Sequence, residues 1–104
     1  MTAEHNIQNN IRIALAPYAV VFRANVGSGV TYDGRHFSTG LPKGFSDLFG
    51  FRYSDGKIFF MEVKTPQGKL RPEQKHFLEQ MKKYGAICGV VRSEKDALEL
   101  IREK

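Results

Sequence analysis

The chain has 104 residues, of which 41% are hydrophobic and 12% aromatic. A chain of this length and composition builds one hydrophobic core, so we expect one folded domain over residues 1–104 and exclude a disordered segment. The net charge of +5 favours a polyanionic partner, although charge alone does not establish one.

The sequence carries no sign of export or membrane insertion. Its N-terminus lacks a charged segment followed by an apolar one, and no apolar run approaches the ~18 residues that span a bilayer. The single cysteine, Cys88, lies in an apolar run and has no intrachain partner for a disulfide. We therefore expect a cytoplasmic protein with no membrane partner.

The first third of the chain predicts a helix followed by strands. Apolar residues recur at helical spacing from about residue 3 until Pro17 ends the pattern. Residues 18–26 have the alternation of a strand, and the glycines at 27, 29 and 34 indicate a hairpin. These glycines match neither a P-loop nor a dinucleotide-binding fingerprint, so we expect no nucleotide cofactor.

The middle of the chain predicts an antiparallel pair of strands. A loop over residues 38–47 leads into strands at 47–52 and 57–64. Asp55-Gly56, between these strands, is a type I′ turn signal, so the two strands should pair directly.

The last third predicts a helix, a strand and a second helix. Pro72 suits the first turn of a helix that ends at Gly85, and residues 86–92 form a short apolar strand. Ser93 then caps a final helix. The order αβββ(β)αβα predicts an α/β fold, in which a mixed β-sheet is flanked by helices.

One predicted strand carries two charges where a buried strand has none. Glu62 and Lys64 are two residues apart, so their side chains share one face of the strand. One interpretation is an edge strand with a solvated salt bridge. The other is a functional pair in a covered strand, where each charge requires a partner.

Asp47 supplies a second carboxylate for the functional interpretation. It begins the strand that should pair with that of Glu62, so the two carboxylates converge near one strand end. Such a pair binds a hard divalent cation such as Mg²⁺, which also takes phosphate oxygens of a substrate. Lys64 would contact the phosphate or the attacking water, and Gln74, facing inward from the next helix, would orient that water.

These features resemble the VRR-NUC domain of the PD-(D/E)XK nuclease superfamily, in its stand-alone bacterial or phage type. The resemblance covers essentially the whole chain and includes a first-helix glutamate, G-x-S-D at 44–47, E-V-K at 62–64 and the Q of RPEQKHF. It implies a restriction-endonuclease-like core and a Mg²⁺- or Mn²⁺-dependent endodeoxyribonuclease that hydrolyses phosphodiester bonds. Two positions depart from the pattern: Ser46 stands where many relatives have Pro, and Arg71 where Ser or Thr would cap the helix better.

The resemblance also implies a role for each site residue. Asp47, Glu62 and the backbone carbonyl of Val63 would bind the metal, with Lys64 as the catalytic lysine and Gln74 in support. Glu4 would be the acid of the first helix, although the helix dipole accounts for a first-turn acid equally well. Basic residues beside the second helix would contact DNA; these are Lys69, Arg71 and Lys75.

The resemblance further implies a homodimer that cuts branched DNA, such as four-way (Holliday) junctions in DNA repair, in a bacterial or phage-infected cell. Two copies suit this task because a one-site domain must pair to cut two strands. We expect the apolar hairpin region of residues 18–37 to form the interface. Two alternatives stay open: a catalytically inactive DNA-binding module on the same fold, and a basic RNA-associated protein.

Overall fold

A computed structural model describes residues 2–24 and 28–103. In this part of the chain, no helix is long and apolar enough to cross a membrane. The predicted strand at 18–26 is shorter than expected, and positions 25–27 lie outside the described residues. The elements are α1 (Ala3–Leu15), β1 (Ala19–Arg23), β2 (Ser28–Val30), β3 (His36–Ser38), β4 (Leu48–Arg52), β5 (Ile58–Val63), α2 (Pro72–Lys83), β6 (Ile87–Val91) and α3 (Glu94–Ile101).

The main sheet has four strands in the order β1-β4-β5-β6. The pairs β1/β4 and β4/β5 are antiparallel, whereas β5 and β6 are parallel and are connected through α2. This confirms the predicted α/β fold with a mixed sheet. Because β5 lies between β4 and β6, it is an inner strand, and the edge-strand interpretation of Glu62 and Lys64 is wrong.

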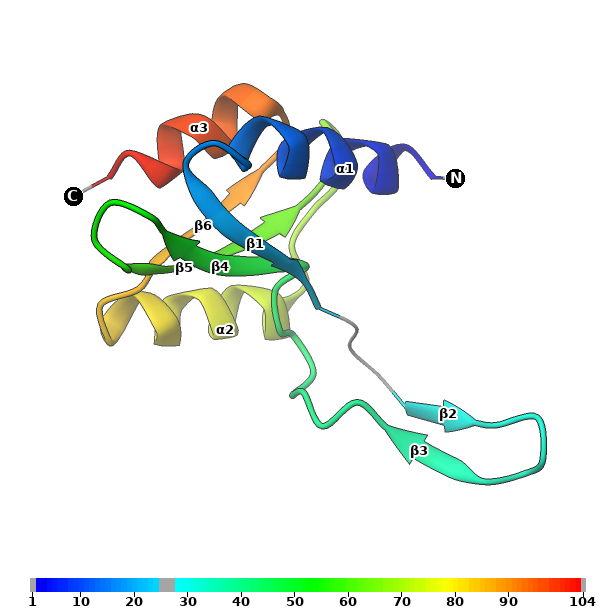
Figure 1. Cartoon of the computed structure of the whole chain (residues 1–104). Helices are drawn as coiled ribbons and strands as arrows, with labels where there is room; N and C mark the ends of the chain where they lie inside the picture. Colours follow the sequence, from blue (N-terminus) through cyan, green and yellow to red (C-terminus); the bar gives the residue numbers. More distant parts are fainter. Residues whose placement is uncertain (1, 25–27, 104) are drawn as a thin grey trace.

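Helices cover both faces of this sheet. Figure 1 shows α1 and α3 over one face and α2 over the other. The alternation along β5 explains the arrangement, because Phe59, Met61 and Val63 join the core cluster that includes Ile11 of α1. Phe60, on the other face, belongs to the cluster formed with α2. Each such burial contributes about 1.5–3 kcal/mol, so β5 is held from both sides.

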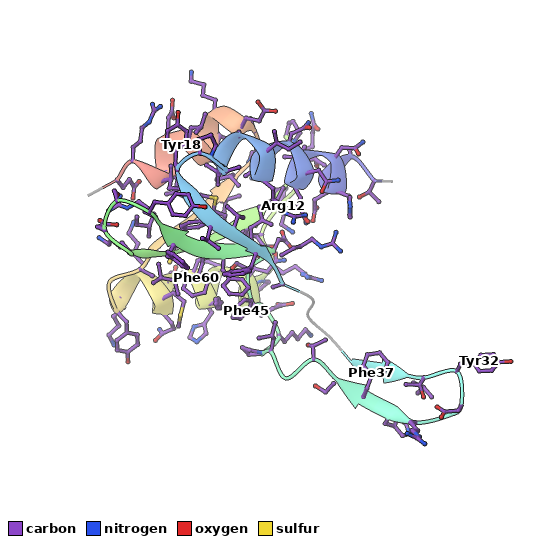
Figure 2. All side chains as sticks on the ribbon, viewed as in Figure 1. Arg12, Tyr18, Tyr32, Phe37, Phe45 and Phe60 are labelled. Carbon is purple, nitrogen blue, oxygen red and sulfur yellow. The ribbon has the colours of Figure 1, made fainter. Side chains whose placement is uncertain are left out.

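The predicted hairpin forms a separate two-stranded sheet, β2 and β3, which we call the arm (residues 28–38). Figures 1 and 2 show it extending away from the body of the molecule, with Tyr32 near its tip. The ring of Phe37 lies over Gly29, 2.9 Å from where a Cβ would be. The Cα radius of gyration, 14.3 Å, exceeds the about 13 Å of a compact chain this long, as a projecting arm requires.

Candidate active site

The register of the sheet brings Asp47 and Glu62 together. Strand β4 pairs Leu48 with Met61, so Asp47, one residue earlier, lies opposite Glu62. The Asp47 carboxylate is fixed there because its Oδ2 accepts a hydrogen bond from the Val63 amide at 2.9 Å. A carboxylate from the residue before β4 and one from β5 therefore meet at one end of the sheet.

Glu62 is buried with only part of its hydrogen bonding satisfied. Its side chain is 1% exposed, and its Oε1 accepts a 2.9 Å hydrogen bond from Gln74 Nε2. Its Oε2 has no hydrogen-bond partner among the described residues. Burial, followed by a hydrogen bond that only the protonated Glu62 carboxyl can share with Asp47 and by charge repulsion from Asp47, raises the pKa of Glu62 well above its ordinary value. The nearby charge of Lys64 offsets part of this rise.

This environment fits a divalent cation. A cation beside Glu62 would give the unpartnered oxygen a ligand and would offset the repulsion between the two carboxylates. Two carboxylates are a usual protein contribution to a Mg²⁺ site, where water and phosphate complete the shell. Within the described residues, no group of three or more His, Cys, Asp or Glu side chains is placed to hold a metal ion. Backbone, water or substrate oxygens would therefore supply the remaining ligands.

Gln74 links Glu62 to the N-terminus of α2. Its Oε1 accepts a hydrogen bond from the Arg71 amide at 2.9 Å, while its Nε2 donates to Glu62. The first of these bonds is half of a capping box, and it compensates for the missing Ser or Thr at position 71. The sequence predicts the inward direction of Gln74 but not this double contact. A Gln three residues after the helix cap was the available signal.

The loop before Asp47 packs tightly against α2. Gly44 has a φ of +90°, and a Cβ there would lie 2.4 Å from the Glu73 carbonyl oxygen, so only glycine fits. Phe45 follows, with its ring centroid 4.7 Å from that of Phe77 and 5.8 Å from that of Phe60. Figure 2 shows Phe45 and Phe60 beneath the sheet, on the side of α2. These contacts fix the approach of the chain to Asp47.

Ser46 completes the support of Asp47. It is fully buried, and its Oγ donates a 3.1 Å hydrogen bond to the Leu48 carbonyl oxygen across Asp47. A proline at this position would stiffen the chain by fixing φ. Here a hydrogen bond and burial do the same, so the departure from the family pattern leaves the carboxylate held.

Lys64 is next to the strand that carries Glu62, whereas Glu4 lies on the first helix. Lys64 follows β5 directly, is partly buried, and donates its amide to the Val91 carbonyl oxygen at 3.1 Å. Glu4 lies on α1, which covers the opposite face of the sheet from α2, and it is the smallest contributor to the raised pKa of Glu62. The structure thus brings Asp47, Glu62, Lys64 and Gln74 to one sheet end, and it leaves Glu4 at the margin.

The basic residues predicted to contact DNA lie in the segment between β5 and α2 and in the first turns of α2. Arg71 is the N-cap of α2, and its Nε is 3.5 Å from Glu73 Oε1. All three side chains are exposed, as a contact surface for a phosphate backbone requires; they are Lys69, Arg71 and Lys75.

Comparisons with known proteins address the family to which the chain belongs. The sequence model of the VRR-NUC domain matches residues 33–95, more than half of the chain, and includes both carboxylates, Lys64 and Gln74. A solved structure described as a VRR_NUC domain is similar, with a TM-score of 0.70 and 28% sequence identity, covering 99% of this chain and 98% of that chain. No curated protein matches the sequence. The chain therefore belongs to the VRR-NUC family of nuclease domains.

Proposed function

We propose that the protein is a Mg²⁺- or Mn²⁺-dependent endodeoxyribonuclease whose catalytic centre contains Asp47 and Glu62. The observation that supports it best is the buried Glu62 carboxyl, which has one oxygen unpartnered among the described residues and the Asp47 carboxylate beside it. Such a group destabilises a purely structural core, because a buried carboxylate with an unsatisfied oxygen is costly. The family adds independent support, since a nuclease domain implies a divalent metal and a DNA substrate.

Each residue has a distinct part in this proposal. Asp47, Glu62 and the carbonyl of Val63 would hold the cation, which when bound polarises the phosphate and makes water a better nucleophile. Gln74 keeps the Glu62 carboxylate oriented through its hydrogen bond. Lys64 contacts the phosphate or the water that attacks it in line, and stabilises the negative charge that develops on the phosphate oxygens.

The substrate we propose is DNA, and specifically branched DNA such as a four-way junction. The exposed Lys69, Arg71 and Lys75 would neutralise backbone phosphates beside the carboxylates, and the net charge of +5 favours the approach of a polyanion. We further propose that residues 1–104 act as one unit and that two copies pair, because one site cuts one strand.

The arm is the surface we propose for that pairing. Its Val30, Tyr32 and Phe37 are 57%, 109% and 48% exposed, and an isolated two-stranded hairpin is marginally stable in water. A second copy of the chain would cover these apolar side chains. The arm leaves the body beside the catalytic centre, where the Ala24 amide donates to the Asp47 carbonyl oxygen at 2.9 Å. Pairing there would hold two centres near one junction.

Incubation with labelled linear, flap and four-way DNA tests the proposal, with Mg²⁺, Mn²⁺ or EDTA present. We expect cleavage of branched DNA with Mg²⁺ or Mn²⁺ and none in EDTA. Full cleavage in EDTA would contradict metal dependence. Tight binding without cleavage under every condition would instead support the inactive DNA-binding module, and a preference for single-stranded RNA would support the RNA-associated alternative.

A further inference from the structure

We infer that Arg92 is a positioning residue for Lys64, acting through the turn that follows β5. The inference rests on the proposed function, since it assigns Arg92 a part in placing the lysine of that catalytic centre. The turn comprises residues 65–68, directly after Lys64, and we call it the Thr65–Gly68 turn.

The Thr65–Gly68 turn folds back against the base of the Lys64 side chain. The Gly68 amide donates to the Thr65 carbonyl oxygen at 3.0 Å, which closes the turn. A Cβ at Gly68 would lie 3.4 Å from the Lys64 Cβ, which is van der Waals contact. If this turn moves, the backbone and Cβ of Lys64 move with it, and the position of the Lys64 ammonium changes.

Arg92 ties both ends of this turn to the end of β6. Its Nη1 donates to the carbonyl oxygens of Thr65 and Gly68, each at 2.6 Å, and lies 3.5 Å from that of Pro66. Hydrogen bonds from a charged donor are about twice as strong as neutral ones. All of these contacts come from the Nη1 nitrogen, whose two hydrogens the planar guanidinium holds in fixed directions, whereas the ammonium of lysine rotates on a flexible stem.

Arg92 is itself firmly placed. Its amide donates to Asp96 Oδ2 at 2.9 Å, and the Asp96 amide donates to Ser93 Oγ at 3.1 Å, so the start of α3 anchors it. The β5/β6 register ends at the pair Val63–Val91, before Arg92. The side-chain contacts of Arg92 thus add nothing to the strand pairing of the sheet. These contacts instead hold the Thr65–Gly68 turn, which directly follows Lys64.

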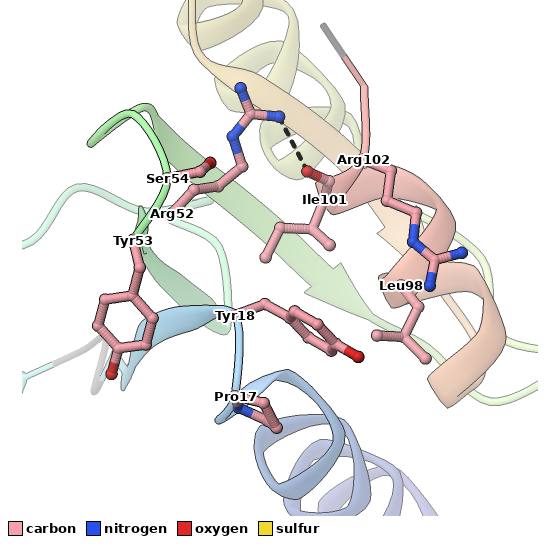
Figure 3. A pocket seen from close by; sticks show the side chains of 8 residues that line it. All are labelled: Pro17, Tyr18, Arg52, Tyr53, Ser54, Leu98, Ile101 and Arg102. Atoms are coloured by element: carbon pink, nitrogen blue, oxygen red, sulfur yellow. Dashed lines mark hydrogen bonds between the residues drawn. The ribbon is translucent and has the colours of Figure 1, made fainter.

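The chain offers a matched control in Arg52, at the end of β4 remote from Asp47. Arg52 also bridges backbone carbonyls, since its Nη1 donates to the Ile101 oxygen at 3.0 Å (Figure 3) and to that of Glu103. It borders a cavity of about 550 Å³ whose lining includes Tyr18 and Tyr53. Loss of either arginine removes a tie between distant segments, but of the two it is Arg92 that contacts the Thr65–Gly68 turn.

The test compares Arg92→Ala, Arg92→Lys and Arg52→Ala with wild type. We measure kcat and KM on a four-way junction with Mg²⁺, at a temperature where circular dichroism shows each variant folded, together with Tm. We expect Arg92→Ala to lower kcat ~10-fold or more with KM within ~3-fold, Arg92→Lys to fall between, and Arg52→Ala to lower Tm with kcat within ~2-fold. Equal losses of kcat in Arg92→Ala and Arg52→Ala at similar Tm would overturn the inference.

A second measurement judges the turn without DNA cleavage. Trypsin cuts after Lys64 and Lys69 report exposure of the turn, and a cut after Lys83 in the same digest reports general unfolding. We expect the first two cuts, relative to the third, to accelerate ~10-fold in Arg92→Ala and to stay unchanged in Arg52→Ala. Arg92→Lys serves for this comparison if Arg92→Ala does not fold. Unchanged ratios would overturn the inference, whereas a wild type inert with every metal would refute the proposed nuclease and leave the digest to judge Arg92.

Discussion

At Glu62, burial in the fold favours the protonated carboxyl, whereas the proposed metal site requires the charged carboxylate. Its buried position raises its pKa, so the folded protein binds a proton there more tightly than the unfolded chain does. Without metal, the stability of the fold therefore decreases as pH rises above the ordinary value of 4.5 towards the raised one. Below that ordinary value the carboxyl is protonated in both states and the penalty disappears.

Because stability falls with rising pH through Glu62, the substitution Glu62→Gln should stabilise the metal-free protein at high pH. Glutamine keeps an oxygen that can accept from Gln74 and removes the ionisable group. In EDTA at pH 8 we expect the Tm to exceed that of wild type by ~2–5 °C, and the difference to vanish near pH 4. Cleavage should fall steeply, because a metal ligand is lost. A lower Tm for the variant at pH 8, measured by circular dichroism, would show that the carboxylate stabilises the metal-free fold.

A second prediction separates Lys64 from Lys69. Lys64→Ala should lower kcat by ~10²-fold, as when a preorganised charge-stabilising group is lost, and should weaken binding only slightly. Lys69→Ala should leave kcat nearly unchanged, raise KM, and reduce the slope of log affinity against log salt by about one. Initial rates and binding on one junction at several salt concentrations measure both. Wild-type rates for Lys64→Ala would remove Lys64 from the catalytic centre.

At the scale of elements, the loop before β4 and the N-terminus of α2 act as one support for the carboxylates. We expect Gly44→Ala to lower the free energy of unfolding by ~2–4 kcal/mol, because a positive φ and a clash with the Glu73 carbonyl add together. Gly40→Ala is the matched control: its φ is +79° and, among the described residues, no atom beyond its chain neighbours lies within 4 Å of where a Cβ would be, so we expect a loss of ~1 kcal/mol from backbone strain. Urea unfolding compares the two, and equal losses would contradict the close contact with α2.

The elements that sequence predicted correctly are those with local signals. Pro72 is the first residue of α2 and Ser93 is the N-cap of α3, so each marks a helix start through its own local chemistry. The alternation of side chains along β5 likewise separates the residues of its two faces. The contacts that sequence missed join distant positions, such as Arg92 with the Thr65 carbonyl, 27 residues away. The arm belongs to the same class, because its turn signals are the same whether the hairpin joins the main sheet or stands apart from it.

For the whole molecule, metal binding should raise the Tm of the protein, and this rise can be measured without any DNA substrate. A cation that binds only the folded state raises Tm in proportion to the logarithm of its concentration once it exceeds the dissociation constant. We expect Mg²⁺ and Mn²⁺ to raise the Tm of wild type at pH 8, and to raise that of Glu62→Gln much less. Identical Mg²⁺ shifts in Tm for wild type and Glu62→Gln would place the cation elsewhere.

Ca²⁺ should support DNA binding with little turnover, because it holds longer and looser ligand geometry.

The exposed arm allows the proposed dimer to be tested. Val30 and Tyr32 are 57% and 109% exposed, on an arm whose two strands pair with each other and, among the described residues, not with the main sheet. If a second copy covers the arm, charges placed there should separate the copies without unfolding the body, because an unpaired charge in an apolar interface is costly. We expect wild type to be a dimer by light scattering at micromolar concentration, and Val30→Asp with Tyr32→Asp to be a monomer with a nearly unchanged Tm.

Tyr84→Asp is the control for this variant, since Tyr84 is 77% exposed at the C-cap of α2, away from the arm. It should remain a dimer. The monomeric variant should keep metal-dependent nicking of one strand, because both carboxylates lie within one chain, and should lose paired cuts across a junction. A wild-type monomer that still makes paired cuts would show that one copy acts twice on the same junction, and that the arm is exposed for another purpose.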